Sequence, residues 1–194
     1  EKSKVVSSLS KMPTKINPIC IHPMFGPGIK TLKGQNIISV PIKDAKKELT
    51  MAKTLFEGAN FVTIDAVEHD KKIAVILGLT HLMNLVFANI ISKDEKTMLT
   101  EKMSGTTFRV QKTLAEGIMT ESPELIETII ANPEIRRVAE ELWKDIGRLL
   151  TAVQESKTDE VIEYVKECQE RLAKHTDVDE SYKRLAKMVK AVEK

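Results

Sequence analysis

Short apolar runs separated by polar turns mark the first part of the chain. Three runs have the length and the β-branched content of strands, at residues 18–21, 36–40 and 60–64. Between the last two runs, residues 44–57 place apolar side chains at helical spacing, and a shorter helix is expected at 3–9. Strands that alternate with helices predict parallel βαβ units, of which three strands form only a part.

The pattern changes to helical spacing after about Asp65, and we expect no further strand. Ser122-Pro123 and Asn132-Pro133 each combine a capping residue with a proline, which is typical of a helix start. Helices are predicted at 66–92, at 106–120 with Thr106 or Thr107 as the cap, and at 122–131, 132–153, 159–174 and 179–193.

The predicted fold is therefore mainly α and has two domains. Residues 1–65 form the C-terminal remnant of a parallel α/β domain of the Rossmann type. Residues 66–194 form an all-helical domain. The loop after Ile21 is rich in glycine and proline, and it is expected at the carboxyl edge of its strand, where ligands bind in open α/β sheets.

One predicted helix is apolar on all sides, since residues 73–92 contain no charged side chain. A segment of this length could span a bilayer. Several polar side chains within it would be costly against lipid, namely Thr80, His81, Asn84, Asn89 and Ser92. The pattern favours a buried core or dimer helix over a membrane span.

Composition and charge narrow the class of protein. The chain of 194 residues is 42% hydrophobic and 30% charged, which is typical of an ordinary globular protein. A net charge of +2 with mixed signs gives no basis for nucleic acid binding. Cys20 and Cys168 show no metal-ligand spacing and are expected to be buried thiols in a reducing compartment, the cytoplasm. No signal peptide is recognisable.

His22 is the first candidate for chemistry, because it follows an apolar run directly and precedes the glycine-rich loop. A neutral imidazole can accept a proton from a substrate hydroxyl near pH 7. A histidine at a strand end is also commonly structural, so position alone leaves both roles open.

His81 and Asn84 project from one face of the long apolar helix because they are three residues apart. They are either a buried hydrogen-bonded pair or part of a binding site. His69 starts the same helix but lies about 120° away from His81 around it, so the two do not form a metal pair. We predict no metal.

Arg109 lies near the start of a predicted helix, between apolar residues. A cation in that position does not favour the helix dipole, which indicates another use. Its planar guanidinium is suited to holding a substrate carboxylate at two points. A solvated surface arginine is the alternative.

The run Ile21-His22-Pro23-Met24-Phe25-Gly26-Pro27 resembles the His-Pro-Met-Phe-Gly motif of prephenate dehydrogenases, which ends a strand of their cofactor-binding domain. The resemblance continues in order along nearly the whole chain. It includes Ala66-Val67-Glu68-His69-Asp70 at the entry to the helical domain, Thr80-His81-Leu82, Phe108-Arg109, and the helices over 115–150.

The resemblance implies an enzyme that uses NAD or NADP to oxidise prephenate, with loss of the ring carboxylate, to 4-hydroxyphenylpyruvate, the precursor of tyrosine. It implies that His22 hydrogen-bonds the ring hydroxyl and that Arg109 binds a substrate carboxylate. His81, His69 and Asn84 would line the substrate site, and Pro23, Met24 and Gly26 would contact the cofactor. The helical domain would form an intertwined homodimer.

Two departures from the family pattern matter. Asn84 stands where some relatives have a second histidine. The family's Gly-x-Gly-x-x-Gly phosphate turn does not occur in this sequence, and of its serine-valine-lysine segment only Ser3 and Lys4 remain nearby. We therefore expect a fragment that dimerises but does not turn over alone.

Two alternatives stay open at this stage. Arogenate, or either cyclohexadienyl acid, would use the same histidine and arginine. A helical dimerisation or regulatory module would have no catalytic role at all.

Overall fold

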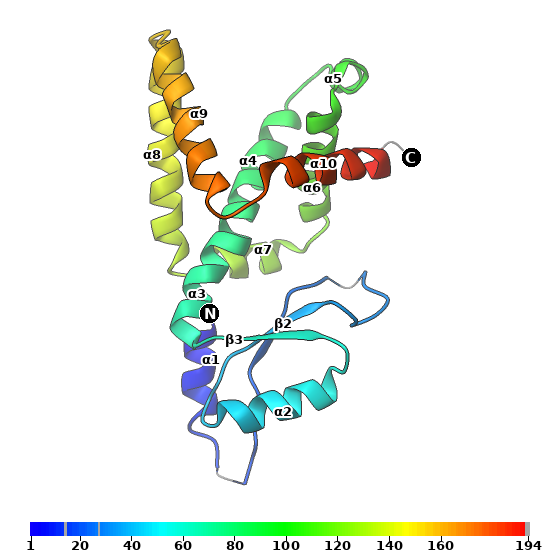
Figure 1. The fold of residues 1–194 in the computed structure, drawn as a ribbon, viewed down its shortest axis with the longest axis vertical. Helices are drawn as coiled ribbons and strands as arrows, with labels where there is room; N and C mark the ends of the chain where they lie inside the picture. The colour runs from blue at the N-terminus through cyan, green and yellow to red at the C-terminus, as the bar shows by residue number, and fades with distance from the viewer. Residues whose placement is uncertain (14, 27, 193–194) are drawn as a thin grey trace. The chain divides into compact units, whose positions relative to one another are not determined.

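A computed structural model describes residues 1–13, 15–26 and 28–192. The described chain divides into two compact units, each named here by its residues (Figure 1). Unit 1 comprises Glu1–Ile76 with Asn132–Ile135, and unit 2 comprises Leu77–Ala131 with Arg136–Lys194. Pro27, from the motif that begins at Ile21, and Glu193, from the last predicted helix, lie outside the described residues. The expectation of a mainly α fold with a small α/β part is confirmed.

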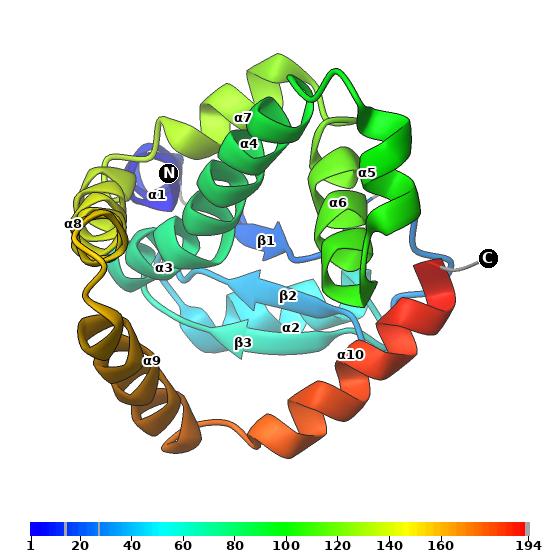
Figure 2. The same cartoon turned by 90° about the horizontal axis from the view of Figure 1, so that it is seen from above.

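Unit 1 contains a three-stranded sheet in the order β1-β2-β3 (Figure 2). Strands β2 (Asn36–Ser39) and β3 (Asn60–Thr63) are parallel and are joined by α2 (Ala45–Leu55), as the alternation of the sequence predicts. Strand β1 (Ile21–Pro23) pairs antiparallel with β2, so the expectation of purely parallel pairing is wrong here. The reason is that β1 and β2 are joined by a loop without a helix, and a parallel pair requires a crossover.

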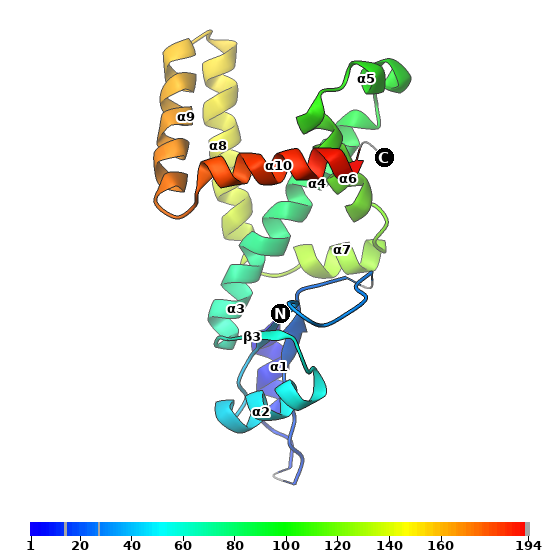
Figure 3. The ribbon, with the colours of Figure 1, turned by 45° about the vertical axis from the view of Figure 1, so that its right-hand side comes forward.

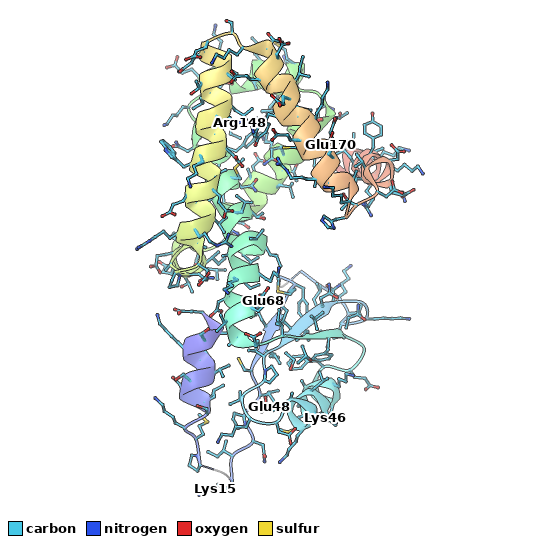
Figure 4. The ribbon with its side chains drawn as sticks, turned by 60° about the vertical axis from the view of Figure 1, so that its left-hand side comes forward. Lys15, Lys46, Glu48, Glu68, Arg148 and Glu170 are labelled. Carbon is cyan, nitrogen blue, oxygen red and sulfur yellow. The ribbon has the colours of Figure 1, made fainter. Side chains whose placement is uncertain are left out.

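The connection from β2 to α2 is fixed by two carboxylates. The side chain of Asp44 caps α2 by accepting hydrogen bonds from the backbone N–H groups of Lys46 and Lys47. Glu48, which Figure 4 labels on α2, is buried and accepts the backbone N–H groups of residues 42, 43 and 44 at 2.7 to 2.8 Å. Because these donors are satisfied by Glu48, the turn is stable despite its partial burial.

Unit 1 also holds two helices that pack on each other, α1 (Lys2–Leu9) and α3 (Ala66–Ile73). Helix α3 continues through a π-helical segment, Ala74–Leu79, into α4 (Thr80–Ile91). The two units divide within that π-helical segment. The domain boundary near Asp65 stays a prediction, while the contacts of α3 with α1 group this helix with unit 1.

Unit 2 is helical throughout its described residues, and α4 and α10 both pack against α6. Helices α8 and α9 run side by side in opposite directions (Figure 3), with Arg148 of α8 forming an ion pair with Glu167 of α9. The remaining helices have these bounds: α5 Thr97–Met103, α6 Thr106–Ile118, α7 Pro123–Ile130, α8 Ile135–Gln154, α9 Thr158–Ala173 and α10 Val178–Val192.

Of two predicted helix caps, the one at Ser122 is confirmed and the one at Thr106 or Thr107 is wrong. Ser122 caps α7 by accepting a hydrogen bond from the backbone N–H of Leu125, as predicted. Helix α6 begins after Gly105 with no side-chain cap, so the expected threonine cap is wrong. Helix α5 was not predicted, because its seven residues are too few to show a clear apolar stripe.

The apolar helix is only partly buried within a single chain. The run Ala66–Ile91 is long and apolar enough to cross a membrane by length and composition, and 28% of its most apolar window is buried. Val86 and Ile90 are 55% and 63% exposed. Burial of this helix, in a core or against a second copy, stays a prediction.

The two cysteines differ in burial. Cys20 is buried as expected, whereas Cys168 on α9 is only half-buried, because the apolar stripe around it is partly exposed. Neither forms a disulfide within the described residues.

Candidate functional site

A chain of hydrogen-bonded side chains in unit 1 centres on His22. His22 lies within β1, opposite Ile38 of β2, and not after the strand as the sequence predicted. Its Nδ1 atom is 2.9 Å from Nε2 of His69. The two rings are 5.2 Å apart between centroids and are tilted by 50°. One histidine of the family motif is thus joined directly to a second, 47 residues along the chain.

His69 and Asp70 reach this site because of how α3 begins. The carboxylate of Asp65 caps α3 by accepting from the backbone N–H groups of Val67 and Glu68. That start places His69 and Asp70 in the first turns of α3, where both are almost fully buried. The Nδ1 atom of His69 is 2.9 Å from Oδ1 of Asp70.

Asp70 ties the pair of histidines to α1. Its Oδ1 accepts the backbone N–H of Lys2 at 2.7 Å. Its Oδ2 accepts the backbone N–H and the side-chain hydroxyl of Ser3 at 3.0 and 2.7 Å. The side-chain amide of Asn132 donates to the backbone carbonyl of Asp70 at 3.0 Å. The carboxylate is therefore held by α1, and the backbone of Asp70 is held by Asn132.

The environment of the cluster shifts two pKa values strongly. Burial, with further contributions from the neighbouring His69 and Lys2, lowers the pKa of His22 to about 4. Burial works against ionisation of Asp70, but the hydrogen bonds from Ser3, Lys2 and His69 prevail and lower its pKa to about 2. At neutral pH, His22 is uncharged and Asp70 is an anion.

His69 is neutral as well. Burial lowers its pKa, and the hydrogen bond and charge of Asp70 only partly oppose that effect. The cluster therefore carries one negative charge, on Asp70, and presents an uncharged imidazole at β1.

His81 occupies a polar position on α4 in unit 2. Its Nδ1 atom is 2.7 Å from the backbone carbonyl oxygen of Leu77, and its Nε2 atom is 3.1 Å from Oε2 of Glu121. The side chain is 5% exposed. Both ring nitrogens thus have acceptors within unit 2.

Asn84 also lies on α4, and it links this helix to α6. Its amide nitrogen donates to the carbonyl of Thr80 at 2.8 Å, and its amide oxygen accepts from Gln111 at 2.8 Å. Among the described residues, His81 and Asn84 therefore pair with other groups and not with each other.

Arg109 lies on α6 and is exposed. Its Nε donates to the hydroxyl of Ser104 at 3.2 Å, and it makes further interactions. His22 and His69 thus belong to unit 1, while His81, Asn84 and Arg109 belong to unit 2.

The residues expected to contact a nicotinamide cofactor lie at the end of β1. The backbone N–H of Met24 donates to the carbonyl of Asn36 at 2.9 Å, which extends the pairing of β1 beyond Pro23. A side chain added at Gly26 would meet no heavy atom within 4 Å, so space for a ligand group is open beside this backbone. Contact of this segment with a nicotinamide cofactor stays a prediction, and a glycine-rich phosphate turn does not occur in this sequence.

The candidate side chains of both units are held by other residues, of which the sequence connected only Ser3 with a site, as a remnant of the family's serine-valine-lysine segment. Ser3 and Asn132 hold Asp70, and Glu121 and Gln111 hold His81 and Asn84. The adjacent pair His69-Asp70 at a helix start was the available signal for Asp70, whereas the other contacts join distant parts of the sequence. Over residues 1–13, 15–26 and 28–192, no group of three or more histidine, cysteine, aspartate or glutamate side chains could hold a metal ion.

Comparison with known proteins identifies relatives of this arrangement. The family described as "Prephenate dehydrogenase, dimerization domain" matches residues 65–167, more than half of the chain. A curated relative is the probable arogenate/prephenate dehydrogenase of Methanocaldococcus jannaschii, 23% identical over 185 residues. That match covers 88% of this chain and 41% of the relative, so the chain spans less than half the relative's length.

Solved structures share the fold. Synechocystis arogenate dehydrogenase matches with a TM-score of 0.61 and 13% identity, over 81% of this chain and 61% of that one. Prephenate dehydrogenase from A. aeolicus, in complex with hydroxyphenyl propionate and NAD+, matches with a TM-score of 0.60 and 18% identity. This match covers 81% of the present chain and 59% of the other.

Proposed function

The chain belongs to the prephenate dehydrogenase family, and on that basis we propose that it carries the catalytic histidine and the substrate-binding helices of an enzyme that oxidises and decarboxylates prephenate. The product is 4-hydroxyphenylpyruvate, which leads to tyrosine. The observation that carries the proposal is the neutral His22 of the family motif, which lies within β1 and is hydrogen-bonded to His69.

The proposed reaction requires His22 to act as a hydrogen-bond acceptor for the substrate hydroxyl. NAD or NADP would supply the acceptor for the hydride that leaves the ring carbinol carbon. The ring carboxylate then leaves as carbon dioxide, and the electrons of the broken bond make the ring aromatic. The hydroxyl oxygen of the substrate becomes the phenol oxygen of the product and is protonated in both. His22 therefore needs only to accept a hydrogen bond from this hydroxyl and does not have to keep its proton. A pKa of about 4 keeps the imidazole of His22 uncharged at neutral pH, so that one ring nitrogen has a lone pair that can accept a hydrogen bond.

Arg109 is proposed to bind a substrate carboxylate. Its guanidinium is exposed on α6, and its forked donors match the two oxygens of a carboxylate. The polar residues His81 and Asn84 of α4 are proposed to line the substrate site, with Glu121 and Gln111 fixing their orientation. Pro23, Met24 and Gly26 are proposed to lie beside the nicotinamide ring.

The partner proposed for the helical part is a second copy of the chain, since the matched family is a dimerisation domain. Exposed apolar side chains on α4 and α8 support this, including Val86, Ile90, Trp143 and Val153 at 55%, 63%, 77% and 66% exposure. We propose the cytoplasm as its location, and neither nucleic acid nor a membrane as its partner.

Arogenate is the rival substrate, and it differs from prephenate by an amino group in place of the side-chain keto group. The test is to measure kcat/KM of the full-length protein for both acids, each with NAD and with NADP. We expect the higher value for prephenate, and the better dinucleotide identifies the cofactor. Oxidation of arogenate alone would transfer the assignment to arogenate dehydrogenase. If neither acid is oxidised with either dinucleotide, the chain is a non-catalytic dimerisation module.

A further inference from the structure

We propose that Asp70 and His69 are positioning residues for His22, which fix the proton of its imidazole on Nδ1 so that Nε2 presents a lone pair to the substrate hydroxyl. The inference rests on the proposed function, in which His22 accepts a hydrogen bond from that hydroxyl. It adds the mechanism that selects the correct tautomer. It also gives His69 a supporting role in place of the substrate contact that the family resemblance implies.

In the hydrogen bond between His69 and Asp70, His69 is the donor. Asp70 receives three donors from α1: the backbone N–H groups of Lys2 and Ser3 and the hydroxyl of Ser3. An ionised carboxylate only accepts, so the Nδ1 atom of His69, 2.9 Å from Oδ1, must carry a proton and donate it. A protonated Asp70 would instead place a donor among these donors.

The hydrogen bond between His69 and His22 has a defined direction as well. A neutral imidazole with its proton on Nδ1 has a lone pair on Nε2. His69 is 3% exposed and neutral, so its Nε2 atom can only accept. The group facing it at 2.9 Å is Nδ1 of His22, which must therefore donate. The proton of neutral His22 is then on Nδ1, and its Nε2 atom is the acceptor.

The opposite arrangement fails at a definite place. If His22 carried its proton on Nε2, two lone pairs would face each other between the rings at 2.9 Å. If His69 instead carried its proton on Nε2, that clash would be removed, but the lone pair on its Nδ1 atom would face the carboxylate of Asp70. Either change loses a buried hydrogen bond and creates a repulsion, so one tautomer is selected as long as His69 is neutral, which the lowering of its pKa by burial favours.

Further hydrogen bonds hold the backbone on both sides of the cluster. Lys2 extends its ammonium group to the backbone carbonyl of Ile21, at 2.8 Å, next to His22. Asn132 holds the backbone of Asp70 from a third segment of unit 1. Since both ring nitrogens of His69 are occupied by protein groups, its available role is to support His22.

Two substitutions of His69 separate positioning from simple packing. In His69→Gln, the side-chain oxygen can still accept from Nδ1 of His22, whereas His69→Leu fills the space without an acceptor. We expect kcat of the full-length protein with prephenate to fall about ten-fold in the glutamine variant and at least about 100-fold in the leucine variant, with KM within about two-fold. A purely structural role predicts the opposite order, because leucine suits a buried site better than glutamine.

The tautomer itself is measured by nitrogen NMR of histidine-labelled full-length protein without substrate. Signals of His22 are those that disappear in His22→Asn. We expect the proton on Nδ1 in the wild-type protein and in His69→Gln, and a mixture of both tautomers in His69→Leu. Asp70→Asn should lower kcat at least about ten-fold with KM little changed, as loss of the aspartate does in the serine protease triad, where the effect reaches roughly 10⁴.

The outcomes distinguish this inference from the proposed function. If the wild-type His22 carries its proton on Nε2, or if His69→Leu keeps both the tautomer and kcat, the positioning role is wrong whatever the substrate. If the tautomers behave as expected but neither prephenate nor arogenate is oxidised, the proposed function is wrong and the positioning role stands.

Discussion

The Nδ1 atom of His22 and the Nε2 atom of His69 lie 2.9 Å apart, which joins strand β1 to the first turns of helix α3 through two imidazole rings. Because His69 also bonds to the carboxylate of Asp70, His22 is the outer member of a three-residue chain that ends at an ionised group.

The pH dependence of activity should reflect the lowered pKa of His22. Burial, His69 and Lys2 together favour the neutral imidazole, so it persists below the usual histidine pKa of 6.5. We expect kcat/KM to stay level from about pH 7.5 to 5.5 and to decline only as the pH approaches about 4. As a control for acid unfolding, the protein is incubated at each pH, returned to pH 7 and assayed there, and its activity should be fully recovered. An acid limb centred near 6.5 would contradict this account of His22.

Stability in acid should depend on Asp70. Its folded pKa of about 2 is below the ordinary value of 3.8, so its stabilising effect is complete above about pH 5 and is lost as the pH falls toward 2. The difference corresponds to roughly 2 kcal/mol of unfolding free energy. Asp70→Asn should lose this contribution at neutral pH and should unfold with a shallower pH dependence between pH 5 and 2.

The measurement for Asp70 is urea unfolding at several pH values. Ser3→Ala provides a graded comparison, because it removes one of the hydrogen bonds to the carboxylate and leaves the others. Its pH dependence should fall between wild type and Asp70→Asn. Equal pH dependence in all three proteins would show that Asp70 is not stabilised as an anion.

Arg109→Gln should raise KM for prephenate while leaving kcat within a few-fold. Losing a charge-assisted contact to a carboxylate costs about 1.5–3 kcal/mol, which is roughly a 10- to 100-fold increase in KM. Arg137→Gln is the matched control, since Arg137 is exposed on α8 and pairs with Glu141 at 2.7 Å. An unchanged KM in Arg109→Gln would remove this residue from the substrate site.

A charge on the exposed face of α4 should disrupt the dimer. Val86 is 55% exposed, and α4 and α7 also line an apolar cavity of about 590 Å³. Val86→Glu should shift the protein toward monomer in sedimentation velocity at low micromolar concentration, because a buried unpaired carboxylate is costly. Leu55→Glu, at a 65% exposed position on α2, should leave the dimer intact. A dimer that tolerates Val86→Glu would place the interface elsewhere.

Local sequence patterns were sufficient for most of the helices and for the parallel pair of strands. The βαβ unit of β2, α2 and β3 follows from apolar runs at the correct spacing, and the Ser122-Pro123 start of α7 follows from capping chemistry. The antiparallel pairing of β1 was missed, although the described residues between β1 and β2 include no helix for the crossover that a parallel pair requires. Apolar composition likewise could not say whether α4 is covered by its own chain.

For the candidate site, residue type and motif identified His22 and His69 but not how they act. The direction of the hydrogen bonds depends on Asp70, whose state is set by Lys2 and Ser3 some 68 positions away in the sequence. Contacts over such separations leave no local pattern. His81 and Asn84 were expected on one face of a helix, which is correct, but their partners Glu121 and Gln111 lie on other segments.

The most direct test of the central claim is single-turnover oxidation of prephenate by the full-length protein, comparing wild type with His22→Asn. The rate of dinucleotide reduction under saturating substrate should fall about 10²- to 10⁴-fold in the variant, with substrate binding retained. His175→Asn, which changes an exposed histidine between α9 and α10, should react at the wild-type rate. A His22→Asn protein that reduces the dinucleotide as fast as wild type would contradict the assignment of His22 as the catalytic acceptor.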